Sequence, residues 1–97
     1  MKLERVMGCT AAELVGWLPR ALPGAVLELE SDAQAGRCRA SFEDGRLTIE
    51  WRVLEPRQIA MLRVPQLKVC FSYSGFEDAR RQVVQTYFDR ATQRGGG

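Results

Sequence analysis

The feature that most constrains the fold of this chain is a hairpin signal near its middle. Asp44 and Gly45 favour a two-residue type I′ turn, because both central residues of such a turn need positive φ. Apolar and polar residues alternate on both sides of this pair, in segments 37–42 and 46–53. We therefore expect two antiparallel strands that share one apolar face and one polar face.

The position of the turn also predicts which residues lie opposite each other. On the apolar face, Cys38 is expected opposite Trp51. On the polar face, Arg37 is expected opposite Arg52, and this contact between like charges needs Glu30 or an anion to neutralise it. The rest of the polar face carries alternating acids and bases, which is typical of a solvated sheet surface.

A strand is also expected before the hairpin, because residues 25–31 alternate between apolar and polar side chains. A turn near Asp32 then leads back to the hairpin. The register that keeps Leu29 on the face of Cys38 places Glu28 opposite Arg39. This strand therefore extends the same sheet.

Two more strands are predicted after the hairpin. Glu55 and Pro56 are expected to end the third strand. Residues 59–64 are apolar at odd and even positions alike, so a covered strand and a short helix both fit, and we favour the strand because Pro65 leaves so little length. Residues 66–74 alternate clearly and predict the fifth strand.

Two capping boxes predict the starts of two helices. Thr10 and Glu13 are spaced to satisfy free backbone N–H groups at the start of the first helix, which Pro19 should kink or end. Ser74 and Glu77 repeat the spacing and open a longer helix. The apolar stripe expected on this second helix comprises Phe76, Ala79, Val83, Val84, Tyr87, Phe88 and Ala91.

Together these elements predict an α+β fold: a helix, a five-stranded mainly antiparallel sheet and a C-terminal helix, with both helices on one sheet face. The 97 residues, 45% apolar and 27% charged, suit a single domain. We place it at residues 1–94, followed by a flexible glycine tail at 95–97. The arrangement resembles a reduced helix-grip fold, in which a long C-terminal helix lies across a curved sheet and a lipid-like ligand sits between them.

Composition argues against several classes of protein. The chain has no histidine, and Cys9, Cys38 and Cys70 lack a Cys-x-x-Cys spacing, so we expect neither a zinc site nor a disulfide framework. Without a histidine relay or a glycine-rich phosphate loop, we expect no enzyme and no cofactor. The first residues lack the apolar run of a signal peptide or membrane span, so the expected location is the cytoplasm, with no membrane partner.

The last four residues, Arg94 and three glycines, resemble the exposed Gly-Gly tail of sulfur-carrier and ubiquitin-like proteins. Those proteins reach the tail from a strand of a β-grasp fold, whereas these glycines follow directly on an expected helix. We therefore interpret them as a helix stop.

Arginine is the most distinctive charged residue, since it supplies 12 of the 14 basic side chains although the net charge is only +2. Arginine favours bidentate contacts with carboxylates and phosphates, so Arg37, Arg39 and Arg52 are candidate anion or partner contacts on the polar sheet face. Nucleic acid is not the expected partner. The aromatic side chains that would stack on bases are expected on the opposite, core face.

The main functional prediction rests on residues 59–64. A strand with helices on one face only should alternate, yet here Ile59 and Met61 share one side and Leu62 and Val64 the other. Something must cover the second side. We expect a small non-catalytic interaction domain that self-associates through these four residues or binds another protein. The first alternative is a small apolar-ligand pocket between the C-terminal helix and the sheet. The second is weak binding of nucleic acid through the arginine-bearing sheet face.

Overall fold

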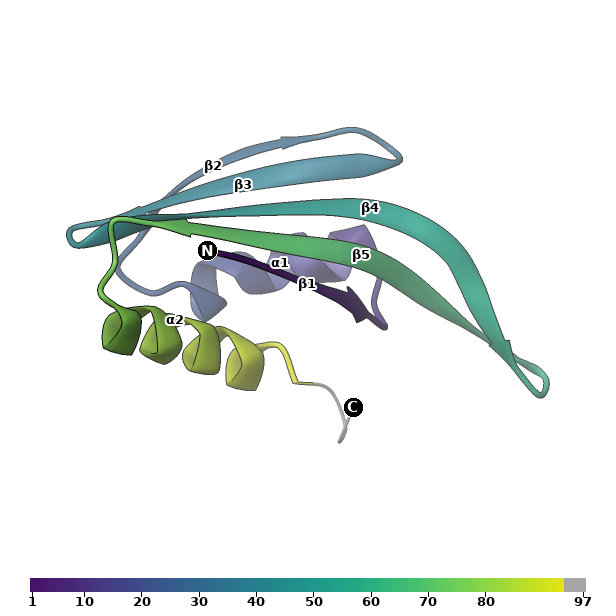
Figure 1. Cartoon of the computed structure of the whole chain (residues 1–97). Coiled ribbons are helices and arrows are strands. Elements are labelled where there is room, and N and C mark those ends of the chain that lie inside the picture. Colours follow the sequence, from purple (N-terminus) through teal and green to yellow (C-terminus); the bar gives the residue numbers. More distant parts are fainter. Residues whose placement is uncertain (94–97) are drawn as a thin grey trace.

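A computed structural model describes residues 1–93 (Figure 1). Its elements are β1 (Lys2–Met7), α1 (Ala11–Ala21), β2 (Val26–Ser31), β3 (Ala35–Phe42), β4 (Gly45–Ile59), β5 (Leu62–Ser74) and α2 (Asp78–Ala91). Residues 94–97 lie outside the described residues, and with them the expected helix stop and flexible tail at 95–97.

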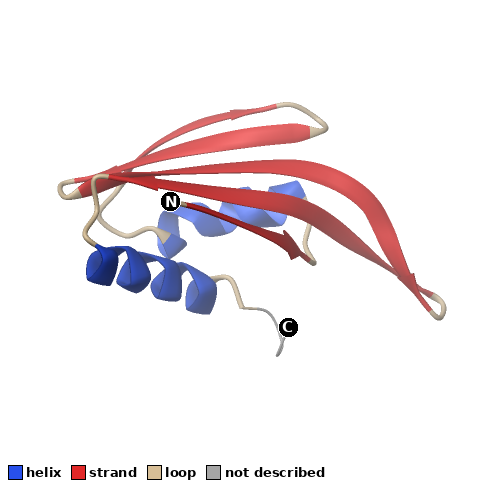
Figure 2. Ribbon diagram, in the orientation of Figure 1, coloured by secondary structure: helices blue, strands red, loops and turns tan. Residues whose placement is uncertain are grey.

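The five strands form one antiparallel sheet in the order β1-β5-β4-β3-β2. Both helices cover the same face of this sheet and leave the other face open (Figure 2). The predicted α+β fold, with its five antiparallel strands and its two helices on one face, is confirmed. Among residues 1–93, neither helix has the length and apolar character needed to span a membrane.

The central hairpin turns earlier than the sequence predicted. Phe42 pairs with Gly45, so Glu43 and Asp44 form the turn, and neither has a positive φ. The predicted type I′ turn is therefore wrong. Gly45 has a different role, because a Cβ atom there would lie 2.6 Å from the ring of Phe76. The glycine makes room for an aromatic side chain from a distant part of the chain.

The earlier turn shifts the β3–β4 register by two residues, which preserves the faces but changes the partners. Cys38 lies opposite Ile49, so the predicted pairing with Trp51 is wrong. Trp51 lies opposite Gly36, where a Cβ atom would come within 2.2 Å of the indole ring. The large ring thus occupies the space that the glycine leaves.

Strand β1 was not predicted from the sequence. It pairs with β5 along its whole length, and its inner-facing residues alternate with exposed ones. One inner-facing residue is Arg5, whose guanidinium donates to Asp89 of α2 at 2.6 Å and lies over the ring of Phe71. An arginine on the inner face weakens the alternation that identifies a half-buried strand.

The segment 59–64 is the end of the β4–β5 hairpin and not a separate strand. Strand β4 continues past the predicted stop, because Glu55 and Pro56 together lie opposite a single residue, Pro65, in a bulge. Such a bulge leaves its extra residue outside the ladder, so proline's missing N–H costs no hydrogen bond there.

Helix α1 begins with the predicted capping box. The Thr10 hydroxyl accepts from the backbone N–H of Glu13 at 3.1 Å, and the Glu13 carboxylate accepts from the N–H of Thr10 at 2.9 Å. The helix does not end at Pro19 but continues to Ala21. Its buried residues are Leu14, Leu18 and Ala21.

The predicted capping box of α2 is wrong, because Ser74 still belongs to β5 and Glu77 makes no side-chain capping bond. The buried side of α2 is also narrower than the predicted stripe. Val83 and Tyr87 are 56% and 50% exposed, while Gln85 is buried. Gln85 is satisfied there because its side chain accepts from the hydroxyl of Tyr73 and donates to Asp89.

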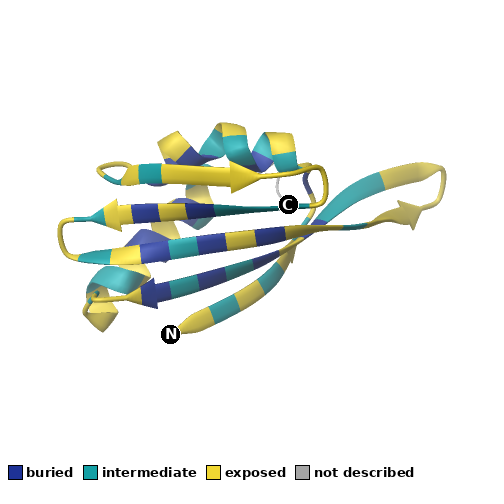
Figure 3. Cartoon of the chain, turned by 90° about the horizontal axis from the view of Figure 1, so that it is seen from above, coloured by how far each residue is buried: buried dark blue, intermediate teal, exposed yellow. Residues whose placement is uncertain are grey.

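The core lies between the sheet and the two helices, and buried residues alternate with exposed ones along β3, β4 and β5 (Figure 3). Phe71 and Phe88 pack edge to face with ring centroids 5.1 Å apart. Phe88 and Trp51 are buried, which confirms both as core residues. The sheet is thus anchored to the helices along its inner half.

Candidate interaction surface

The outer part of the β4–β5 hairpin projects from the rest of the sheet and bends toward the side that carries the helices (Figure 1). We name residues 54–64 the arm. Every residue from 55 to 63 is exposed, while Leu54 and Val64 at the base are partly buried. The arm is therefore a paired hairpin that the described part of the chain leaves uncovered.

The end of the arm is apolar. Ile59, Met61 and Leu62 are 48%, 94% and 68% exposed. Full burial of such a side chain is worth about 1.5–3 kcal/mol, so a partner that covered this surface would bind favourably. The structure thus brings three of the four predicted dimer residues to one exposed end, and it places the fourth, Val64, at the base.

The turn at the end of the arm is strained. Ala60 has a φ of 52°, and it is the one non-glycine residue with a positive φ among residues 1–93. A left-handed conformation costs an alanine roughly 1–2 kcal/mol. Strained backbone tends to occur at binding sites and active sites, so this turn is consistent with a functional role for the arm.

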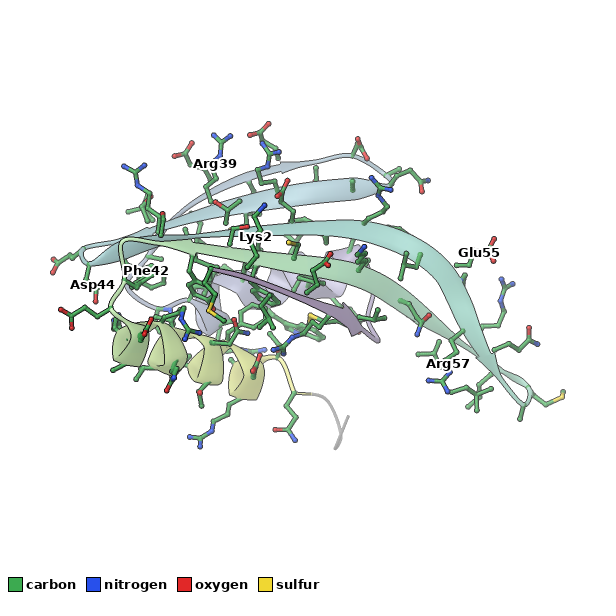
Figure 4. The ribbon with its side chains drawn as sticks, viewed as in Figure 1. Lys2, Arg39, Phe42, Asp44, Glu55 and Arg57 are labelled. Carbon is green, nitrogen blue, oxygen red and sulfur yellow. The ribbon has the colours of Figure 1, made fainter. Side chains whose placement is uncertain are left out.

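The bulge at the base of the arm sets its direction, because a bulge bends the strand that contains it. Glu55 in the bulge lies on the convex side of the arm and Arg57 lies on the concave side (Figure 4). Neither side chain forms an ion pair with another described residue. The concave side of the arm faces the same direction as the helix layer.

A cavity of about 700 Å³ lies at the base of the arm. It is bordered by the end of β1, by α1, by the last turns of α2 and by β5. Its apolar wall includes Val6, Met7, Trp17 and Val64. Because Val64 belongs to both, the arm and the cavity form one continuous surface. The partly buried Trp17 therefore borders a cavity as well as packing at the core edge.

Of the three arginines predicted to bind an anion, Arg37 and Arg52 line one groove on the open face, and Arg39 lies outside it. Arg37 donates to the carboxylate of Glu50 at 3.0 and 3.2 Å. The predicted contact between Arg37 and Arg52 is wrong, because the two-residue shift places Glu50 opposite Arg37. Arg39 lies opposite Glu28, as predicted, and points away from the core (Figure 4). Arg37 is thus paired with a carboxylate of its own sheet.

The open face of the sheet lacks an aromatic platform in the described residues, since Trp51, Phe71 and Tyr73 all face the core. A shallow groove along it has lining residues of both signs, among them Glu30, Asp32, Glu50, Arg37, Arg52 and Lys68. Hydrogen bonds from the backbone of Gln34 and Ala35 hold the pKa of Asp32 below its usual range. These features are typical of a solvated, salt-linked surface.

The three cysteines lie in different surroundings. Cys9 and Cys38 are buried, and Cys70 lies partly buried on the open face. Burial raises the pKa of Cys38 to about 11, which keeps the nucleophilic thiolate scarce at neutral pH. Within residues 1–93, no cluster of three or more histidine, cysteine, aspartate or glutamate side chains is arranged to hold a metal ion.

The cavity was missed because β1 was missed. Strand β1 and the segment after it supply Arg5, Val6, Met7, Gly8 and Cys9 to the lining. The alternation of Leu3, Arg5 and Met7 was the available signal. It is incomplete, because Val6 on the opposite side of the strand is apolar as well.

No model of a known protein family matches the chain, and no curated protein matches its sequence.

Proposed function

We propose that this protein is a small interaction domain, that its arm is the binding element, and that its partner is a second copy of the same chain. The exposure of Ile59, Met61 and Leu62 at the end of a projecting hairpin carries this proposal. Long, exposed apolar hairpins favour association because they offer both unburied side chains and unpaired strand edges.

The arm is longer than a connecting loop, and its two strands are paired to the end. A hairpin connection needs only about 2–5 residues, so the arm is far longer than the link between two strands requires. Its pairing continues to the end, where Ile59 lies opposite Leu62. An isolated two-stranded hairpin is marginally stable in water, which means that a partner would stabilise the arm as well as bury it.

A second copy is the partner that the arrangement favours. Ile59, Leu62 and Val64 share one side of the arm, because Ile59 lies opposite Leu62 and Val64 follows two residues later. The predicted division of these residues between two sides is therefore wrong. A two-fold dimer lets each copy use this one apolar surface twice. Two-fold dimers are also the commonest assemblies among homo-oligomers.

Sedimentation at tens of micromolar tests the proposal. We expect wild type to sediment as a dimer and Leu62→Glu as a folded monomer, because burying an unpaired carboxylate is unfavourable. Val26→Glu is the matched control: Val26 is 70% exposed, close to the 68% of Leu62, but lies on the opposite edge strand. It should remain a dimer. A wild type that stays monomeric would contradict the proposal.

A small apolar ligand in the cavity is the second candidate function. The volume of about 700 Å³ is within the usual range of ligand pockets, roughly 300–1,000 Å³. The site differs from the pocket expected between helix and sheet, since Phe71 and Phe88 fill the centre of that interface. Trp17 provides the test. In a Trp51→Phe variant, which retains Trp17 as its one tryptophan, added dodecanoate should change the fluorescence; no change at solubility-limited concentration would exclude this ligand class.

A further inference from the structure

We infer that the arm of one copy occupies the cavity of the other, so that the dimer forms by reciprocal exchange of arms. This inference rests on the proposed function and adds the surface that receives the arm.

The positions of the arm and the cavity support the exchange. Both lie at the same end of the molecule, and the arm bends toward the side of the helices that border the cavity (Figure 1). A two-fold axis that passes between them would place each arm end over the partner's cavity. Such a contact is isologous: the arm of the first copy meets the cavity of the second, and the reverse contact is identical.

The arm does not fill the cavity of its own chain. Val64 lines the cavity, and Met61 precedes it by only three positions along a paired hairpin. Met61 is nevertheless 94% exposed. A continuous β-ladder is too stiff to fold back over so short a distance, so the apolar end and the apolar wall of one chain remain apart. A second copy removes this restriction.

The size of the interface also favours exchange over contact between two arm ends. A stable interface uses roughly 20–30 residues from each side, and an arm alone supplies only about ten. The cavity has twelve lining residues, of which Val64 already belongs to the arm. Arm and cavity together therefore reach the lower end of the usual range. A cavity also excludes water from several sides of an inserted side chain, whereas a flat contact covers one side.

A variant of the cavity wall and a control on the far edge strand test this contact. Met7 lies on the inner side of β1 and borders the cavity, whereas Val26 lies on the edge strand at the other side of the sheet. We expect Met7→Arg to raise the dimer dissociation constant at least tenfold, because the inserted arm would bury an unpaired charge. Val26→Arg should leave the constant unchanged. Thermal melts of both variants establish that the monomers are folded.

Disulfide trapping identifies the contact directly. Chains carrying Met61→Cys and chains carrying Met7→Cys, both in a Cys70→Ser background, are mixed and oxidised in air, so that a bond between the two new thiols joins different chains. We expect this pair to cross-link and a Met61→Cys with Arg39→Cys pair to remain unlinked, because Arg39 lies on the open face.

The outcomes separate the two proposals. A dimer that survives Met7→Arg and cross-links only between two Met61→Cys chains would overturn the exchange and keep self-association. A wild type that is monomeric in sedimentation would overturn both.

Discussion

The two halves of the β4–β5 hairpin share one antiparallel ladder but differ in what covers them. In the inner half, Leu47, Ile49 and Trp51 of β4 are buried against the helices, and β5 shows the same alternation. In the arm, residues 55–63 are exposed whichever way they point. Figure 3 shows this change along the same two strands. Strand pairing alone therefore does not bury side chains, and a second layer is needed to do so.

This difference in cover implies a difference in local stability. The inner half gains hydrophobic energy from the helix layer, whereas the arm has only its ladder and cross-strand pairs worth roughly 0.2–1 kcal/mol each. Regions with few buried contacts open at lower free energy than the core. We therefore expect the monomeric arm to open independently of the body.

The largest expected difference is between core and arm truncations. Phe88→Ala should lower the free energy of unfolding by about 3–5 kcal/mol, because the ring is fully buried against Phe71. Leu62→Ala should change it by no more than about 0.5 kcal/mol in the monomer. Urea denaturation at low protein concentration measures both. Equal effects would show that the arm is packed as tightly as the core.

Alkaline pH should destabilise the body. Burial raises the pKa of Cys38 from 9.0 to about 11 and that of Tyr73 from 10.0 to about 12. The unfolded chain therefore releases these protons at lower pH than the folded chain, and stability is retained below about pH 9 and lost as the pH rises toward 11 and 12.

For Cys38 the loss is on the order of 2–3 kcal/mol at full titration, since each pKa unit corresponds to about 1.4 kcal/mol. Urea midpoints measured from pH 7 to 11 should fall less steeply for Cys38→Ala than for wild type. The arm variant Leu62→Ala should show the full wild-type slope. The same slope in both variants would disprove this origin of the pH dependence.

A third prediction compares two glycines of the body. Gly36→Ala should cost about 1–3 kcal/mol, because its Cβ atom would overlap the indole of Trp51. A Cβ atom at Gly16 in α1 would meet nothing within 4 Å beyond its chain neighbours and its own helix backbone, so Gly16→Ala should instead stabilise the helix by roughly 0.5–1 kcal/mol. Thermal melts of the two variants should therefore shift in opposite directions.

The smallest effect is expected in the arm. Ala60→Gly should relieve the left-handed strain and stabilise the arm by up to about 1 kcal/mol. Amide hydrogen exchange should detect this as slower exchange of the paired amides in residues 57–64, with exchange in the inner half unchanged. Faster exchange in the arm would show that the left-handed conformation of Ala60 does not destabilise the arm.

Local patterns predicted the features that depend on near neighbours in the sequence. The capping box at Thr10, the β2–β3 register of Leu29 and Cys38, and the buried positions of Trp51 and Phe88 are all confirmed. In each case the spacing or alternation of nearby residues was enough to predict the feature.

Distant contacts decided the features that the sequence did not predict. Arg5 lies on an inner strand face because Asp89, 84 residues later, neutralises it. Gly45 is required by Phe76 and not by its own φ. The apolar composition of residues 59–64 was visible in the sequence. Their position at the end of a projecting arm was not, because it depends on a bulge at prolines that the sequence analysis interpreted as strand ends.

The pairing of β1 with β5 has a consequence for the order of folding. The backbone N–H of Tyr73 donates to the carbonyl of Met1 at 2.9 Å, so this edge of the sheet joins segments that almost the whole domain separates. Closing so long a loop is entropically costly, and non-local pairing of this kind slows folding. During synthesis, β1 leaves the ribosome well before β5, so its pairing partner is absent at first. The inner residues of β1 stay unpaired until nearly all of the domain has been made.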